Sequence, residues 1–177
     1  MEGTINAFAR SEKARIARRE GFIPGVVYGK DVKNMPVKFE RNKLLNFLKE
    51  KGEKAKINFL LNNEKKQGII KEVERDLATT EIIHIDIQAI TEKENVKWTV
   101  PVDFLGKDLL KNRDLYIQVY NSDVEVEGDS SKIPNKVKIE VNNMKFGEEI
   151  KIKDLNLDPS IKLLKDPETV IAVITNS

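Results

Sequence analysis

The sequence predicts a mainly β protein of the α+β class, built as two domains with only short helices. Stretches rich in Val, Ile and Phe recur along the chain with turn residues between them, which is the pattern of β-strands. A polar segment without apolar periodicity, residues 92–95, divides the chain near its middle. The 177 residues are enough for two small domains, each with its own core. We therefore expect domains at residues 1–91 and 96–177, joined by a linker at 92–95.

The front half is predicted to combine strands with two helical segments. Residues 11–20 are expected to form a loop and a short helix, with Ser11 as N-cap and Gly21 as C-terminal cap. Residues 41–50 show apolar side chains at helical spacing, and Gly52 follows them as a stop signal. The strands expected here are Thr4–Ala9, Phe22–Gly29, Met35–Phe39, Ile57–Leu61, Gln67–Val73 and Thr80–Ile90, with a hairpin turn at residues 62–64.

The rear half is predicted to be all β, with no helix longer than two turns. Its strands are short and regularly spaced, which is typical of a sandwich or a barrel. They are expected at Val96–Leu105, Leu115–Val119, Val124–Glu127, Lys136–Val141, Glu149–Ile152 and Thr169–Thr175.

Composition excludes several classes of protein. The chain has no cysteine, so disulfides, thiolate metal sites and a thiol nucleophile are excluded. Its first residues lack the basic start and apolar run of a signal peptide. No stretch approaches the roughly 18 apolar residues that a membrane-spanning helix needs. We expect a soluble cytoplasmic protein.

The net charge of +2 hides an asymmetry between the two halves. Residues 1–91 carry 18 Lys and Arg against 13 Asp and Glu, whereas residues 92–177 carry 13 against 16. The front half is therefore +5 and the rear half −3. This distribution predicts that the front half meets a polyanion and the rear half does not, unless the lysines serve only solubility.

A basic segment lies near the start of the chain. It contains five cations and one acid, Glu12; the cations are Arg10, Lys13, Arg15, Arg18 and Arg19. If residues 13–20 are helical, Arg15, Arg18 and Arg19 share one face, where a phosphate backbone would relieve their mutual repulsion. Arginine is also suited to bidentate phosphate contacts. The alternative is a solvated helix face whose charge Glu12 and Glu20 offset.

The last predicted strand of the front half has two different faces. Successive side chains of a strand point to opposite sides. Ile83, Ile85, Ile87 and Ala89 are therefore expected to fill the core, and the opposite face is formed by His84, Asp86 and Gln88, spaced about 7 Å apart. Such a row can read the edges of successive bases. The alternative is that it is simply the solvated side of an amphipathic strand.

Catalysis is not supported by the residues around His84, the only histidine. Asp86 beside it could orient a general base, but no serine lies in a nucleophile motif. A metal-dependent hydrolase built on His84 and Asp86 would need a further ligand that the sequence does not supply. We expect a protein that is not an enzyme and that has no cofactor.

Several segments together resemble the bacterial large-subunit ribosomal protein twenty-five family, in its two-domain form known as the general stress protein Ctc. The first is residues 13–29, KARIARREGFIPGVVYG, preceded by Arg10. The second joins residues 70–76, IKEVERD, to residues 83–87, IHIDI. The rear half adds residues 101–106, PVDFLG, then Ile133-Pro134, and residues 166–172, DPETVIA. The resemblance covers nearly the whole chain.

The resemblance implies a six-stranded or similar N-terminal β-barrel with short helices, related to an anticodon-binding domain and followed by an all-β domain. It further implies binding to 5S ribosomal RNA in the central protuberance of the large subunit. The family's RNA-contacting positions correspond to Arg10, Arg18, Arg19, Tyr28, His84 and Asp86. Lys13, Arg15, Lys71 and Gln88 are added as candidate RNA-binding residues from their positions in this sequence.

The sequence thus predicts that the arginines contact phosphates while His84 and Asp86 read base edges or 2′-hydroxyls in a shallow minor groove. A free RNA chaperone or tRNA-binding stress protein using the same face is the main alternative. For the rear domain, the residues leave three options open: contact with RNA, contact with a neighbouring ribosomal protein, or no contact.

Overall fold

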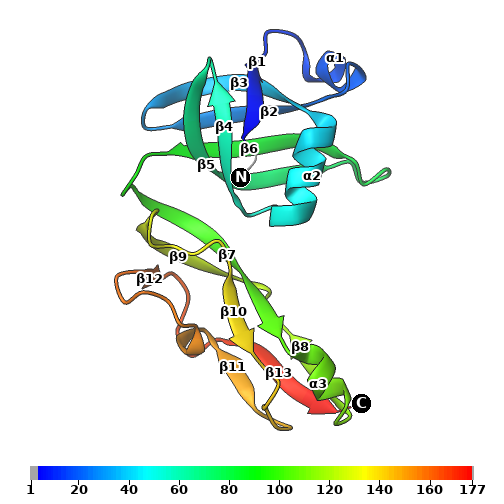
Figure 1. Cartoon of the computed structure of the whole chain (residues 1–177), viewed down its shortest axis with the longest axis vertical. Coiled ribbons are helices and arrows are strands. Elements are labelled where there is room, and N and C mark those ends of the chain that lie inside the picture. The colour runs from blue at the N-terminus through cyan, green and yellow to red at the C-terminus, as the bar shows by residue number, and fades with distance from the viewer. Residues whose placement is uncertain (1–3, 177) are drawn as a thin grey trace. The chain divides into compact units, whose positions relative to one another are not determined.

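The structure, a computed structural model, describes residues 4–176 and separates into two compact units, Met1–Glu92 and Lys93–Ser177 (Figure 1). The first is a closed barrel with the strand order β1-β3-β2-β6-β5-β4, and the second contains two small sheets. The predicted mainly β class, the six-stranded N-terminal barrel and the all-β rear part are confirmed. None of the helices within residues 4–176 is long and apolar enough to cross a membrane.

The barrel unit is formed by six strands and two helices, which follow the expected order. Their bounds are β1 (Ile5–Ala9), α1 (Ala14–Arg19), β2 (Phe22–Gly29), β3 (Val32–Glu40), α2 (Arg41–Lys51), β4 (Lys56–Leu61), β5 (Glu64–Arg75) and β6 (Ile82–Ile90). Two of the six pairings, β1 with β4 and β2 with β6, are parallel, and the other four are antiparallel.

The predicted hairpin and the second helix are confirmed. Asn62 and Asn63 take positive φ values of 51° and 66° between β4 and β5, which is the geometry of a two-residue hairpin turn. Gly52 ends α2 with a φ of 93°, a backbone conformation that side chains disfavour. Leu44 and Leu48 of α2 are buried in the barrel core.

The start of the first helix differs from the prediction. Ser11 is exposed and caps nothing; Lys13 is the N-cap, and its carbonyl accepts from the amides of Ile16 and Ala17. The reason lies before the helix, where the amide of Arg10 donates to the carbonyl of Pro36 and extends the pairing with β3. The predicted cap at the other end is confirmed, because Gly21 has a φ of 84° and donates its amide to Arg18.

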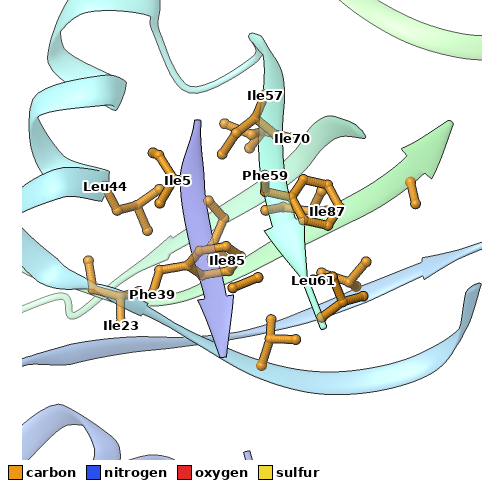
Figure 2. Close-up of a cluster of buried hydrophobic side chains, with 14 of the residues drawn as sticks. Ile5, Ile23, Phe39, Leu44, Ile57, Phe59, Leu61, Ile70, Ile85 and Ile87 are labelled. Atoms are coloured by element: carbon orange, nitrogen blue, oxygen red, sulfur yellow. The ribbon is translucent and has the colours of Figure 1, made fainter. Parts of the chain in front are cut away.

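The barrel core is filled by the alternate side chains of all six strands. Figure 2 shows large aliphatic and aromatic side chains from strands far apart in the sequence converging inside the barrel. The largest completely buried members include Phe39, Phe59, Ile23, Ile85 and Ile87. Because each face alternates with period two, burying these residues directs their neighbours outward.

Two glycines of β2 permit its parallel pairing with β6. A Cβ atom on Gly25 would lie 2.4 Å from the carbonyl oxygen of Ile85, and one on Gly29 would lie 2.5 Å from that of Ala89. Both obstacles are main-chain atoms of β6, which cannot rotate away. The contact between these strands, and therefore the closure of the barrel, requires glycine at these positions.

The rear unit contains a four-stranded sheet with the order β10-β7-β9-β12 and a three-stranded sheet with the order β11-β13-β8. Every strand predicted for this half is present, but β12, the 3-10 helix η1 and the helix α3 were not anticipated. Two to five residues are too few to show a hydrophobic period. The bounds are β7 (Asn95–Leu105), α3 (Lys107–Lys111), β8 (Leu115–Val119), β9 (Asp123–Asp129), β10 (Val137–Glu140), β11 (Glu149–Lys151), η1 (Ile152–Asp154), β12 (Lys162–Leu163) and β13 (Val170–Asn176).

Replacing Gly25 with alanine tests the closure of the barrel. We expect Gly25→Ala to lower the free energy of unfolding by about 1–3 kcal/mol, because β2 and β6 must separate to admit the methyl group. Chemical denaturation followed by circular dichroism measures the change. Val26→Ala is the control on the same strand, with a half-buried outward side chain. A Gly25→Ala protein as stable as Val26→Ala would contradict the close approach.

Candidate nucleic-acid interface

The predicted polar row lies on the outer face of β6. His84, Asp86 and Gln88 are half-buried, while Ile85, Ile87 and Ala89 between and beyond them face the core. The alternation expected from the sequence holds for these six residues.

The core face of β6 starts differently from the prediction. Ile83 was expected to be buried, but it is half-exposed and Ile82 is buried instead. The pairing of β5 with β6 runs from Glu74 opposite His84 directly to Arg75 opposite Ile82, so Ile83 is the extra residue of a β-bulge. The bulge reverses the inside–outside alternation before His84, which a strict period of two cannot anticipate.

A second bulge lies in β5, where the strand pairs with Asp86 and Ile87 of β6. Ile70 pairs with Ile87 and Glu72 pairs with Asp86, so Lys71 is the extra residue. Lys71 is half-buried, and its carbonyl accepts a hydrogen bond of 3.3 Å from Nζ of Lys54. The two bulges bracket the segment that carries His84 and Asp86, a location at which bulges commonly re-aim side chains.

His84 and Asp86 are in direct contact. Nδ1 of His84 lies 3.0 Å from Oδ1 of Asp86. With a proton on Nδ1, the ring donates to this carboxylate and leaves Nε2 as the nitrogen available to a ligand. The second carboxylate oxygen retains its capacity to accept. The pair can therefore offer two neighbouring polar atoms in a fixed orientation.

Tyr28 joins the row from β2. It lies opposite Gln88 in the parallel pairing of β2 with β6. Burial raises the pKa of the Tyr28 hydroxyl, and the negative charges of Asp86 and Glu72 raise it further. The hydroxyl is therefore a donor beside two carboxylates, so the four side chains of the row supply both donors and acceptors.

Two acids that are not among the residues predicted from the sequence border the row on the side of β5. Glu72 is paired with Asp86 and Glu74 with His84, and both glutamates are exposed. The alternating segment Glu72-Val73-Glu74 was the available signal, but the bulge at Lys71 decides which β6 residues the glutamates face. This side of the row is therefore acidic.

The opposite side is bordered by the basic segment, where Lys38 of β3 binds both nearby acids. Its Nζ lies 2.8 Å from Oε1 of Glu12 and 3.3 Å from Oε2 of Glu20. The contact with the ammonium group of Lys38 lowers the pKa of Glu12, and the same contact raises the pKa of Lys38. Lys38 also lies 4.6 Å from the ring centroid of Phe22, which meets Phe8 edge-on at 6.0 Å. The two acids are thus matched by a lysine outside the segment.

Two of the predicted cations bind main-chain carbonyls of the barrel. Nη1 of Arg18 lies 3.3 Å from the carbonyl oxygen of Ile83, at the bulge next to His84. Arg10 donates from Nε to the carbonyl of Val37 at 3.4 Å and from Nη1 to that of Glu12 at 2.5 Å. The bond from Arg18 ties the helix α1 to β6, whereas the bond from Arg10 to Val37 ties the segment before the helix to β3. Each guanidinium keeps further N–H groups for a ligand.

The other three cations are exposed. Lys13, Arg15 and Arg19 form no ion pair or side-chain hydrogen bond with any residue from 4 to 176. On the same helix, Arg18 is half-buried, whereas Arg15 and Arg19 are exposed. The helix faces solvent with Arg15 and Arg19, and Lys13 precedes them.

Comparisons with known proteins match both units of the chain. The Ribosomal L25p family model matches residues 5–87, and the model for the C-terminal domain of ribosomal protein TL5 matches residues 95–177. The large ribosomal subunit protein bL25 of Clostridium tetani is 54% identical over 177 residues, covering all of this chain and 92% of that protein. The chain belongs to the bL25 family. The bL25 protein of Desulfitobacterium hafniense is 36% identical over 176 residues, covering 99% of this chain and 98% of its own length.

Family membership confirms the resemblance noted in the sequence, including its two-domain form. Proteins of the bL25 family are components of the cytoplasmic ribosome. Within residues 4–176, no group of three or more His, Asp or Glu side chains is arranged to hold a metal ion.

The contact between Lys38 and Glu12 predicts a pH dependence of stability. Glu12 has a lowered pKa, so its contribution is present above the ordinary value of 4.5 and is lost as the pH falls through the lowered pKa. Lys38 has a raised pKa, so its contribution is present below 10.5 and is lost as the pH rises through the raised pKa. The difference in denaturation midpoint between the natural protein and Lys38→Met should therefore be largest between about pH 5 and 10.

Lys43→Met is the matched control. It removes an exposed pair, with Nζ of Lys43 2.8 Å from Oε2 of Glu40, and exposed pairs contribute little. Equal, pH-independent effects of the two substitutions would show that Lys38 does not hold Glu12 in solution.

Proposed function

We propose that this bL25-family chain is a constituent of the large ribosomal subunit that binds 5S ribosomal RNA in the central protuberance through its barrel unit. The observation that supports this most is the position of exposed, unmatched cations beside a row of base-reading side chains. Arg18 links the two features, because it belongs to α1 and contacts the main chain of β6 next to His84.

The charges around the row favour one path for the RNA backbone. Phosphates are attracted to Lys13, Arg15 and Arg19 on the side of α1 and repelled by Glu72 and Glu74 on the side of β5. The backbone therefore follows α1, and the bases or riboses lie over β6. A-form RNA exposes a wide and shallow minor groove, which fits the outer face of a barrel.

The two parts of the surface have separate tasks. Contacts from Arg15 and Arg19 to phosphates add affinity for any RNA. Asp86 only accepts hydrogen bonds, so it is compatible with base amino or imino groups and not with phosphate. His84, held by Asp86, and the hydroxyl of Tyr28 add a nitrogen and a donor at fixed positions. Discrimination between RNAs therefore depends on the row.

Replacing both free arginines tests the affinity component. We expect Arg15→Gln combined with Arg19→Gln to weaken binding to every RNA. The slope of log K against log salt should fall by about one ion per arginine, because each phosphate contact that is lost means that one counterion fewer is released on binding. Fluorescence anisotropy with labelled 5S ribosomal RNA at several salt concentrations measures this. Lys49→Gln on α2, also an exposed cation, is the control. An unchanged slope in the double variant would show that Arg15 and Arg19 do not contact the RNA phosphates.

Replacing Asp86 tests the specificity component. We expect Asp86→Asn to cost on the order of 1–3 kcal/mol of binding free energy with 5S ribosomal RNA, because half of its acceptor capacity is lost, and little with tRNA. The measurement is competition between the two RNAs for the full chain. Glu74→Gln makes the same change in charge on the neighbouring strand and should not weaken binding. If 5S ribosomal RNA is not preferred over tRNA by the natural protein, the proposal fails.

A further inference from the structure

The strand β8 forms one edge of the sheet β11-β13-β8, and its core-facing side is incompletely covered. In the pairing with β13, Ile117 lies opposite Ile174 and Val119 opposite Ala172. Ile174 is 1% exposed and Ala172 0%, whereas Val119 is 38% exposed and Ile117 is half-buried. Directly opposite residues share a face of the sheet, so the apolar layer that is closed at β13 is open at β8.

Other edges of the rear unit do not show this opening. The edge strand β11 buries its central Ile150, which is 3% exposed, and the edge strand β10 buries Val137, which is 6% exposed. Among the edge strands β8, β10 and β11, only β8 therefore has an exposed apolar layer.

The main-chain groups of β8 that point away from β13 can be assigned from the neighbouring bonds. The carbonyl of Ile174 accepts from the amide of Gly147, and the amide of Ile174 donates to the carbonyl of Glu148, each at 2.9 Å. Ile174 thus uses both groups on the side away from β8. In an antiparallel pair its opposite residue, Ile117, then directs its own amide and carbonyl outward. The same alternation directs those of Leu115 and Val119 outward, and no other strand within residues 4–176 pairs with them.

The composition of β8 also lacks the usual protection of an edge. Exposed edges are commonly guarded by charged side chains, which discourage pairing with another chain. The edges formed by β10, β11 and β12 each contain at least one lysine. Residues 115–120, Leu-Tyr-Ile-Gln-Val-Tyr, contain no charge in a chain that is 34% charged. Its two tyrosines, Tyr116 and Tyr120, are exposed.

We infer that β8 is a docking edge that pairs with an extended segment of another protein of the ribosome. Alternating amide and carbonyl groups match the main chain of an added strand, and its apolar side chains would close the open layer beside Ile117 and Val119. Residues 115–120 supply no cation for a phosphate, which favours a protein over RNA at this edge. The inference rests on the proposed function for the presence of the chain in the subunit, and it concerns a different unit of the molecule.

Hydrogen exchange measured by mass spectrometry on the full chain tests this docking. The probe is purified large ribosomal subunits stripped of their own copy of the protein. We expect exchange in a peptide covering residues 115–120 to slow by at least about tenfold on binding, because strand addition bonds the outward amides. A peptide covering the opposite edge strand β11 should not change.

A charge on the docking edge should remove this protection. We expect Val119→Lys to leave co-sedimentation with the subunits intact, because the barrel unit still binds, and to abolish the slowing at residues 115–120. Glu149→Lys, on the edge strand β11, is the matched control and should retain the slowing. A photo-reactive phenylalanine analogue at position 119 should cross-link to a protein of the subunit.

The possible outcomes separate this inference from the proposed function. Co-sedimentation with unchanged exchange at residues 115–120 would overturn the docking edge and leave the role of the barrel intact. Cross-linking to RNA, or protection that grows with the concentration of the free chain, would overturn it in favour of RNA or a second copy. Failure to co-sediment would overturn both.

Discussion

The parallel contact between β2 and β6 is the constraint on which the candidate interface depends, because it brings Tyr28 and the helix α1 beside the polar row of β6. It exists because Gly25 and Gly29 have no Cβ atom where the carbonyls of β6 pass. Through this contact Tyr28 of β2 lies beside Gln88, and the helix α1, which leads directly into β2, lies where Arg18 reaches the carbonyl of Ile83. The contact that closes the barrel therefore also brings these surface groups together.

The two sides of the polar row of β6 have opposite charge. Lys38 binds Glu12 and Glu20, so these two acids do not offset the arginines of the basic segment. Glu72 and Glu74 lie on the other side of the row. In the proposed complex, this gradient from positive to negative across β6 orients the RNA backbone before any base contact forms, and the bases or riboses lie over the half-buried side chains of β6. In the rear unit, by contrast, the edge strand β8 contains no charged side chain.

Period-two alternation was sufficient to predict the outer row of β6 and most of its inner face. It failed at Ile83, and the reason is physical: one extra residue in a strand reverses the alternation, and a bulge leaves no mark in a hydrophobic pattern. Ser11 had the chemistry of an N-cap, but pairing of Arg10 with β3 delayed the helix to Ala14. In both places a contact distant in sequence outweighed a local preference.

The sequence by itself determined the class of fold, the order along the chain of all strands but β12, and the two halves with opposite charge. It also determined the residue types proposed to contact RNA. All of these depend on composition and on short-range periodicity. Only the tertiary structure decided which of those residues lie close together. Register and bulges placed Glu72 and Glu74 beside the row, a lysine of another strand bound Glu12 and Glu20, and Arg18 was turned toward the barrel. These outcomes depend on how strands pair across the closed barrel, which residues adjacent in sequence do not specify.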